Sequence, residues 1–495
     1  MQVIQNRVIS MPITLSNILR NTLIFIGMIE GLILLFYGHN IREGLGECLW
    51  LLPITFSVCF SLFGEVFDYH KGGIALKIYY AVLVCRYIIL PYTIYLSGGE
   101  TGYYMPSVRY PVSYWVAIIV MCIELIISVV VIKKTYKKTY NKAKKSIINS
   151  NRYKCNTITS GGWLVIGFLC LILIVRINYV IPSTNIILLK DSAEDAGVWY
   201  EAIIVNCLKA FGFAMLMQKI HRSRGARINI IYYIMAVVLA LANFGIYYGS
   251  NRAYIVMTLI ATLFIYMYIY PQYKMISMVA LIPIGIVCVV TMFVNKQFGV
   301  ELSEFSTSDL GVQSISNIIE LYIGGPWNYA SGFEASFGRY LPDIGMIVAG
   351  YIQKFALANI PGFKWLHYIE YACTPLYGTD IYAWDAYQTS LGIYGNSQIL
   401  SGVMEILVMY GQAIGWIVSL AYQIWISRML VKIECYGKLL DDIGYKYLYA
   451  WLGVMLGMYM CYSPALLLWV WSKFALFYWL MLKFNDKVRI RRGRY

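Results

Sequence analysis

The sequence predicts an all-α polytopic membrane protein, on three observations of composition and pattern. Of its 495 residues, 60% are hydrophobic and only 13% are charged, whereas a soluble domain carries about 45–50% apolar and about 25% charged residues. The mean hydropathy is +0.63. The apolar residues gather in runs of roughly 20, the length that a helix needs to cross the hydrocarbon core. These observations exclude a soluble globular enzyme, a disordered chain and a collagen-like fibre.

About twelve apolar runs are long enough to be membrane-spanning helices. The first lacks a small-residue cleavage site, so we expect a retained helix and not a signal peptide. The last two are separated only by Tyr462-Ser463-Pro464 and form either a hairpin or one broken helix. Between the fourth and fifth runs, the basic segment 133–160 is the nearest thing to a flexible linker. The runs centre on residues 20–37, 48–67, 74–96, 112–132, 162–181, 199–218, 228–248, 253–270, 275–294, 400–425, 446–462 and 465–482.

The distribution of charge predicts the orientation of these spans. The net charge is +15, and most of the 40 Lys and Arg lie in alternate connections that begin with the N-terminus. The richest are residues 133–154, 219–227 and 483–494, while most acidic residues lie in the opposite connections. Because Lys and Arg collect on the cytoplasmic side, both termini are predicted to be cytoplasmic. Topology explains the basic segments, so the expected partner is the lipid bilayer and not a nucleic acid.

One connection, between spans 9 and 10, is far longer than the others. We expect residues 295–398 to form a large extracytoplasmic loop inserted in a single integral membrane domain of residues 1–495, and a connection of that length is usually functional. Two short helices are predicted within it, near residues 344–355 and 363–371. Its aromatic and amide side chains suit sugar binding, although an aromatic belt at the membrane surface is the alternative. The loop residues of interest are Tyr322, Trp327, Asn328, Arg339, Lys364, His367 and Asp385.

Ionisable residues inside apolar spans are costly and therefore candidates for function. Arg86 and Lys209 lie deepest, and each either lines a polar cavity or closes an internal ion pair. Arg176 lies near the outer end of its span, where it could also snorkel to the surface. Glu405 either serves the chemistry or makes a hydrogen bond between helices. The whole set comprises Glu30, Glu65, Arg86, Glu124, Arg176, Lys209, Glu405 and Lys473.

The strongest local signal is the outer turn Tyr247-Tyr248-Gly249-Ser250-Asn251-Arg252-Ala253 between two apolar spans. Arg252 opens the second of these spans, where the helix dipole already favours an anion. An arginine adds a planar fork of donors that fits phosphate oxygens. The alternative is an arginine that snorkels and fixes the helix end.

Metal and cofactor chemistry is not expected. The four histidines, His39, His70, His221 and His367, do not cluster in sequence, and neither an HExxH motif nor a phosphate-binding loop is present. The first outer loop also lacks the paired aspartates that metal-dependent membrane glycosyltransferases commonly place there. The 11 cysteines are scattered without a CxxC pair, so disulfides are not expected to shape the fold.

Three groups of residues resemble the oligosaccharide repeat-unit polymerases (O-antigen polymerase or Wzy type), a family related to the O-antigen ligases. The layout of spans with one long outer loop is similar over nearly the whole chain. The first group is Gly249-Ser250-Asn251-Arg252, which opens an apolar helix that ends near Tyr270-Pro271. The other two are Gly324-Gly325-Pro326 with Phe337-Gly338 and Leu341-Pro342-Asp343-Ile344, and Asn396-Ser397 with Glu405 and Gly411.

The resemblance implies metal-independent glycosyl transfer at the outer face of a bacterial cytoplasmic membrane. The donor would be a glycan on undecaprenyl pyrophosphate, and the acceptor a second lipid-linked repeat unit. The product would be O-antigen, capsule or another exopolysaccharide. A chain-length regulator and a flippase are further partners that the resemblance implies. A ligase that uses the same donor, or a flippase for lipid-linked glycans, is the alternative function.

Roles for individual residues follow from the resemblance together with their chemistry. Arg252 is expected to bind the pyrophosphate, and Arg339 to assist it. Glu405, His367 and Asp385 are the candidates for the base that deprotonates the acceptor. The remaining predicted contacts to substrate are Lys364, Arg176, Lys209, Trp327, Asn328 and Tyr322.

Overall fold

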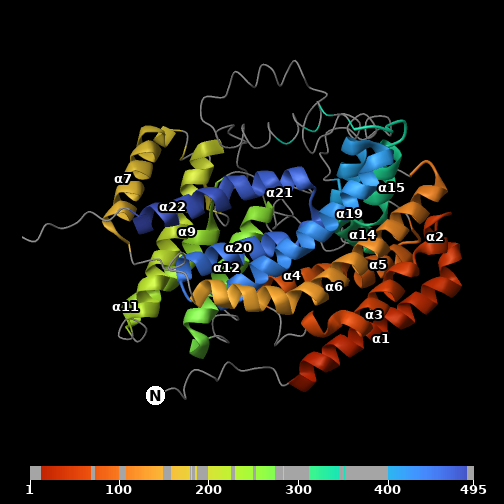
Figure 1. The fold of residues 1–495 in the computed structure, drawn as a ribbon, viewed down its shortest axis with the longest axis horizontal. Coiled ribbons are helices and arrows are strands. Elements are labelled where there is room, and N and C mark those ends of the chain that lie inside the picture. Colours follow the sequence, from red (N-terminus) through yellow and green to blue (C-terminus); the bar gives the residue numbers. More distant parts are fainter. Residues whose placement is uncertain are drawn as a thin grey trace, which may run out of the picture. The chain divides into compact units, whose positions relative to one another are not determined.

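A computed structural model describes residues 13–67, 73–99, 108–148, 158–178, 184–186, 199–223, 229–248, 252–273, 311–342 and 400–487, together with the isolated positions 180, 283, 344, 347 and 351. The regular elements of the described residues are helices (Figure 1) and one short two-stranded ladder. The chain divides into two compact units. The first comprises Met1–Asn141, Ser306–Cys435 and Met455–Trp469, and the second comprises Lys142–Phe305, Tyr436–Val454 and Val470–Tyr495.

The first unit begins with a pair of long helices that pack closely. In α1 (Ile13–Tyr37), Gly27 and Gly31 face α3 (Leu51–Phe63), which follows the short α2 (Leu45–Cys48). A Cβ atom on Gly27 would lie 2.4 Å from the Ser57 hydroxyl oxygen, so only glycine permits this approach. The opposite face of α1 exposes large apolar side chains, as a helix that faces lipid must.

The third span contains a wide turn at its centre. It consists of α4 (Ile74–Val84), a π-helical turn (Cys85–Ile89) and α5 (Leu90–Leu96). Pro91 lies just beyond the turn, and a proline clashes with the carbonyl four residues earlier and removes one backbone donor. A π-helical turn accommodates the clash and the missing donor without ending the helix. Arg86 lies on the turn and is completely buried.

The predicted outer loop contributes to the core of the first unit. Its described part contains α14 (Val312–Ile323), which packs against α5, and α15 (Pro326–Ala335). Every residue of α15 except Phe333 is buried. The unit is completed by α19 (Gly402–Leu439), a 3-10 turn (Tyr459–Cys461) and α21 (Pro464–Trp471).

The second unit contains α7 (Ser160–Val175), α9 (Trp199–Arg222), α11 (Ile230–Gly245), α12 (Arg252–Ile269), α20 (Ile443–Gly457) and α22 (Phe477–Lys487). Its interior is aromatic, with the Trp451 and Phe474 ring centroids 4.6 Å apart. Strand β1 (Thr184–Ile186) pairs antiparallel with β2 (Ile246–Tyr248), so that Asn185 lies opposite Tyr247. The predicted outer turn, residues 247–253, therefore overlaps strand β2, which the local sequence pattern did not indicate.

The helices agree with most of the predicted spans. Within the described residues, seven helical segments are long and apolar enough to cross a membrane, which supports a polytopic membrane protein. Three further predicted spans, at 162–181, 228–248 and 253–270, coincide with shorter apolar helices. The predicted span 446–462 overlaps the 15-residue α20, and 275–294 lies outside the described residues. The seven segments are Asn17–Asn40, Leu45–Phe67, Ile74–Leu96, Pro111–Ile148, Glu201–Arg222, Gly402–Leu439 and Pro464–Asp486.

The expectation of a flexible linker over 133–160 is wrong for its first half. Helix α6 (Pro111–Ile148) continues through the lysine-rich segment without a break. Lysine is a good helix former, and no Gly or Pro interrupts residues 133–148. Tyr136 and Tyr140, four residues apart on one face, also stack with their ring centroids 6.3 Å apart.

Candidate functional site

Helix α15 is held by polar side chains that bond to three other segments of the first unit. The Asn328 side-chain oxygen accepts a hydrogen bond from the Ser401 backbone N–H at 2.9 Å. The Tyr329 hydroxyl donates to Glu124 at 2.5 Å. The Glu334 carboxylate accepts from the two backbone N–H groups directly before α6, at 2.9 and 3.2 Å. These bonds explain how a helix rich in small and polar residues can be buried.

The Gly324-Gly325-Pro326 motif makes the tight connection between α14 and α15. Gly324 ends α14 with φ of 67°, a left-handed conformation that favours glycine. A Cβ atom on Gly325 would lie 1.9 Å from a carboxylate oxygen of Glu320. That carboxylate accepts hydrogen bonds from the backbone N–H groups of Trp327 and Asn328, at 2.6 and 3.2 Å. Glu320 thus supplies the N-terminal cap of α15 from the preceding helix.

We expect Glu320 to make the stability of this hairpin depend on pH. Burial raises the pKa of Glu320 from 4.5 to about 7, against the opposing effect of its hydrogen bonds and of Arg86. Because the folded state then binds more protons than the unfolded state between these two values, stability falls as pH rises through this range. The loss is on the order of 3 kcal/mol at most. Thermal unfolding at several pH values should show this component in the wild type and not in Glu320→Gln, whereas Glu43→Gln, at an exposed carboxylate, should retain it.

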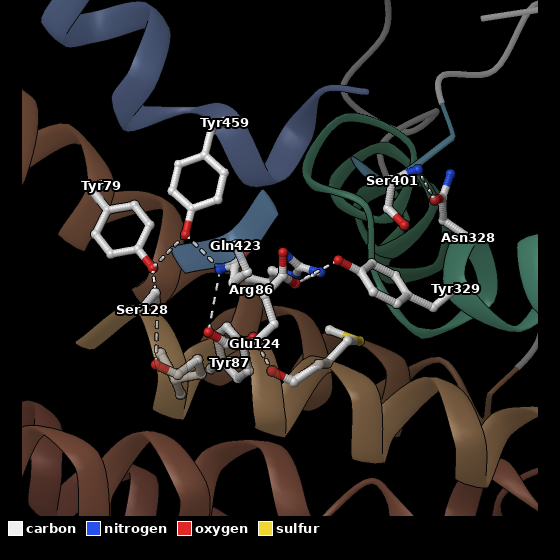
Figure 2. A network of polar contacts seen from close by, with 12 residues as sticks. Tyr79, Arg86, Tyr87, Glu124, Ser128, Asn328, Tyr329, Ser401, Gln423 and Tyr459 are labelled. Carbon is white, nitrogen blue, oxygen red and sulfur yellow. Dashed lines mark hydrogen bonds and ion pairs between the residues drawn. The ribbon is translucent and has the colours of Figure 1, made fainter. Parts of the chain in front are cut away.

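Two buried charges from different spans form an ion pair against α15. The Arg86 Nη2 atom lies 3.3 Å from a carboxylate oxygen of Glu124, and both side chains are buried. The Arg86 guanidinium carbon lies 4.8 Å from the centroid of the Tyr329 ring. Figure 2 shows Glu124 and Arg86 together beside Tyr329. Of the two alternatives that the sequence left open for Arg86, the structure shows the internal ion pair.

A second group of hydrogen bonds extends from this pair into the helix bundle (Figure 2). The Gln423 side-chain amide donates to the Tyr459 hydroxyl at 2.7 Å and to the Glu124 backbone carbonyl at 3.3 Å. The Tyr79 hydroxyl donates to Ser128 at 2.6 Å, and the Tyr79 and Tyr459 rings stack with their centroids 5.5 Å apart. These contacts join α4, α6 and α19 without involving α15.

Glu405 lies near the start of α19 and is completely buried. Its carboxylate accepts a hydrogen bond from the Ala465 backbone N–H at 3.1 Å, in the first turn of α21. It also accepts from the Tyr351 hydroxyl at 3.5 Å. The candidate base is therefore oriented by the first turn of α21.

The segment that contains Arg339 is seated in a break of α19. Gly411 interrupts the helix with φ of 73° and ψ of 161°. The backbone N–H groups of the next two residues donate outward, from Gln412 to the Arg339 carbonyl at 2.8 Å and from Ala413 to the Tyr340 carbonyl at 3.2 Å. The motif around Arg339 and the motif around Gly411, which are far apart in the sequence, therefore meet in the fold.

Substitution of Gly411 should loosen this contact. In Gly411→Ala, the new Cβ atom would lie 2.6 Å from the Tyr340 carbonyl and the residue would keep a left-handed φ. We expect a loss of about 2–3 kcal/mol of stability and at least a tenfold slower transfer reaction, because Arg339 would be displaced. Thermal unfolding and product yield measure the two effects. Gly212→Ala is the control, since no atom lies within 4 Å of its Cβ position, and wild-type behaviour of Gly411→Ala would contradict the prediction.

Two predicted cations of the second unit bond to its own elements. Arg176 is one-third exposed, and its Nε atom lies 2.9 Å from the buried carboxylate of Glu201. The Lys209 ammonium donates to the backbone carbonyls of Asn243, at 3.4 Å, and of Ile246. Lys209 thereby holds the end of α11 and the start of β2, the segment that leads to Arg252. Arg252 begins α12, and its side chain lies outside the described residues.

The other predicted residues fall into two groups. Tyr322, on α14, is 40% exposed, whereas Trp327, on α15, is only 3% exposed. Lys364, His367 and Asp385 lie outside the described residues. In the part of the chain that the structure describes, no three His, Cys, Asp or Glu side chains are arranged to hold a metal ion. The sequence indicated Arg86 and Glu124 as charges within spans, but it gave no sign that Tyr329 would contact them or that Glu320 would cap α15.

Comparisons with protein-family models, with curated proteins and with solved structures gave no match.

Proposed function

We propose that the protein polymerises undecaprenyl-pyrophosphate-linked oligosaccharide repeat units into a surface polysaccharide at the outer face of a bacterial cytoplasmic membrane. The observation that carries the proposal is the meeting of two motifs of the polymerase resemblance. The motif around Arg339 bonds to the break of α19 after Gly411, and α15, which follows Gly324-Gly325-Pro326, bonds to Ser401. Twelve spans with both termini in the cytoplasm complete the proposed topology.

The proposed reaction is a glycosyl transfer with a pyrophosphate leaving group. A hydroxyl of the acceptor sugar attacks the anomeric carbon of the donor, forming a new C–O bond while the C–O bond to the pyrophosphate breaks. The acceptor proton passes to a base, and undecaprenyl pyrophosphate leaves. Arg252 is the proposed group that stabilises the charge developing on the leaving group, and Arg339 is a second candidate for that role. Arg252 adds its charge to that of the α12 N-terminus.

Glu405 is the candidate base that lies within the described residues. Its position is fixed by the Ala465 N–H and the Tyr351 hydroxyl, and a positioned carboxylate is suited to general-base catalysis. His367 and Asp385 are the other two candidates for this role. Glu405→Gln keeps the size of the side chain and removes the base, so loss of activity with retained folding would support Glu405 among the three.

The predicted sugar contacts divide by exposure. Tyr322 is exposed on α14, which suits an aromatic ring that stacks on a sugar. Trp327 and Asn328 are buried, and Asn328 holds the start of the segment that leads to Glu405 through Ser401. Both would act on the substrate indirectly, by fixing the positions of neighbouring side chains. Lys364, Arg176 and Lys209 complete the proposed set of binding residues.

Deletion of the gene in its host tests the proposal and separates it from its rivals. Lipid-linked and surface glycans would be extracted and compared by sizing gel and mass spectrometry. Surface glycan reduced to single repeat units, with intact lipid-linked units, would support a polymerase. Long lipid-linked polymer that never reaches its final acceptor would indicate a ligase, and repeat units retained on the cytoplasmic leaflet a flippase. An unchanged glycan would contradict all three. Complementation by Arg339→Ala should fail, and complementation by Arg428→Ala, at an exposed arginine on α19, should succeed.

A further inference from the structure

The Arg86–Glu124 pair lies near mid-depth of two spans. Arg86 follows Ile74 by twelve residues in a 23-residue apolar segment, and Glu124 follows Pro111 by thirteen. At a rise of about 1.5 Å per residue, both lie roughly 18–20 Å from the start of their helices. The hydrocarbon core of a bilayer is about 30 Å thick. In helices that span a bilayer, these two positions fall deep within the hydrocarbon region.

Helix α15 reaches this same depth. The Tyr329 hydroxyl donates to the Glu124 carboxylate at 2.5 Å, and the Tyr329 ring lies against the Arg86 guanidinium. Both ends of the α14–α15 hairpin connect to segments that the sequence places on the outer side. A segment that enters and leaves on one side while reaching mid-depth is a re-entrant hairpin, which membrane proteins tolerate only where its backbone is buried in protein. The near-complete burial of α15 meets that condition.

Burial of the pair and docking of the hairpin depend on each other. Two charges removed from water are tolerated only when good geometry and further hydrogen bonds compensate their desolvation. Tyr329 provides both a hydroxyl donor for Glu124 and a ring for Arg86, and it comes from α15. In return, the pair gives α15 a charged acceptor, whose hydrogen bonds are stronger than those between neutral groups.

We propose that Arg86 and Glu124 are positioning residues that, together with Tyr329, form an intramembrane anchor for the re-entrant α14–α15 hairpin. The anchor sets the position of two groups that are proposed to act on the acceptor sugar, and we call their location the acceptor site. One is Tyr322, on α14. The other is the Ser401–Glu405 segment, which α15 holds through Asn328. This role at the acceptor site rests on the proposed polymerase function, whereas docking of the hairpin does not.

The first unit offers a matched control for the Tyr329 hydroxyl. Tyr79 is also a buried tyrosine, and its hydroxyl donates to Ser128 at 2.6 Å within the bundle. That bond joins α4 to α6 and does not involve α15. Tyr329→Phe and Tyr79→Phe thus remove the same atom from the same unit, and only the first removes a bond to the hairpin.

The experiment uses the full chain in lipid nanodiscs with two readouts. Hydrogen exchange detected by mass spectrometry reports on the backbone of residues 326–335. Initial rates at several concentrations of lipid-linked repeat unit give KM and kcat. For Tyr329→Phe we expect about 10- to 100-fold faster exchange in α15, as for loss of a hydrogen bond to a charged group, and at least about a tenfold rise in KM with a smaller change in kcat. Tyr79→Phe should leave both readouts within about threefold of the wild type.

A second pair of variants keeps the test valid if one protein folds poorly. Glu124→Gln retains an oxygen that can accept the Tyr329 hydroxyl, so its KM should rise less than that of Glu124→Ala. Unchanged α15 exchange in Tyr329→Phe, equal loosening of α15 by Tyr79→Phe, or faster exchange with unchanged KM would each overturn the proposal. If exchange responds as expected while the wild type forms no polymer, the anchor is supported and the polymerase function fails on its own.

Discussion

Arg252→Ala is expected to abolish polymer formation, with a loss of at least about 100- to 1,000-fold in rate, while the amount of protein in the membrane stays unchanged. Removal of one preorganised donor to a developing anion typically costs that much. Arg252 is the first residue of α12, so its charge and the helix dipole favour an anion at the same place. Arg252→Lys should rescue poorly, because an ammonium lacks the planar fork of the guanidinium.

The measurement for Arg252 is polymer length and yield in a deletion strain that carries each variant, with protein amount determined in the same membranes. Arg428→Ala removes an exposed arginine from α19 and controls for the loss of one positive charge. If Arg252→Ala still makes full-length polymer, the assignment of this residue to the pyrophosphate is wrong.

Removal of one charge from the Arg86–Glu124 pair should give the largest loss of stability. Arg86→Met or Glu124→Leu leaves a buried charge without its partner, and such changes cost about 3–5 kcal/mol. The double variant Arg86→Met/Glu124→Leu leaves neither charge behind, and replacement of a buried pair by apolar residues is often neutral or stabilising. We therefore expect the double variant to regain most of the stability that each single variant loses.

Equilibrium unfolding of the purified variants in mixed detergent measures these free energies and their coupling. The double variant should nevertheless keep a raised KM for the repeat unit, since the Tyr329 hydroxyl has lost its acceptor. Strictly additive destabilisation by the two substitutions would show that the charges do not form a functional pair.

The local pattern of apolar residues predicted most of the long helices, because a run of about 20 apolar residues is typical of a membrane-spanning helix. Prediction from local pattern fails at α15, because the polar residues Asn328, Ser331 and Glu334 are typical of a surface loop. The partners of Asn328 and Glu334 lie far away in the sequence, and Tyr329 and its partner Glu124 are 205 residues apart. Local pattern does not reveal which distant groups will meet, so the burial of this helix was not predictable from its composition.

The same limit explains what the sequence indicated about the site. Arg86 and Glu124 stood out because charges within spans are costly, but their mutual pairing and the contribution of Tyr329 required the fold. The break of α19 at Gly411 was hidden within one apolar run, since glycine also occurs within unbroken membrane helices. Strands β1 and β2, with three residues each, were too short to show an alternating pattern.

Reconstitution tests the central proposal most directly. The purified chain would be placed in liposomes with lipid-linked repeat units from its host, in the presence of a metal chelator, and the products would be resolved by size. We expect a ladder of polymers spaced by one repeat unit, formed with release of undecaprenyl pyrophosphate and lost in Arg252→Ala. Repeat units that stay single in the presence of the folded wild-type protein would contradict it.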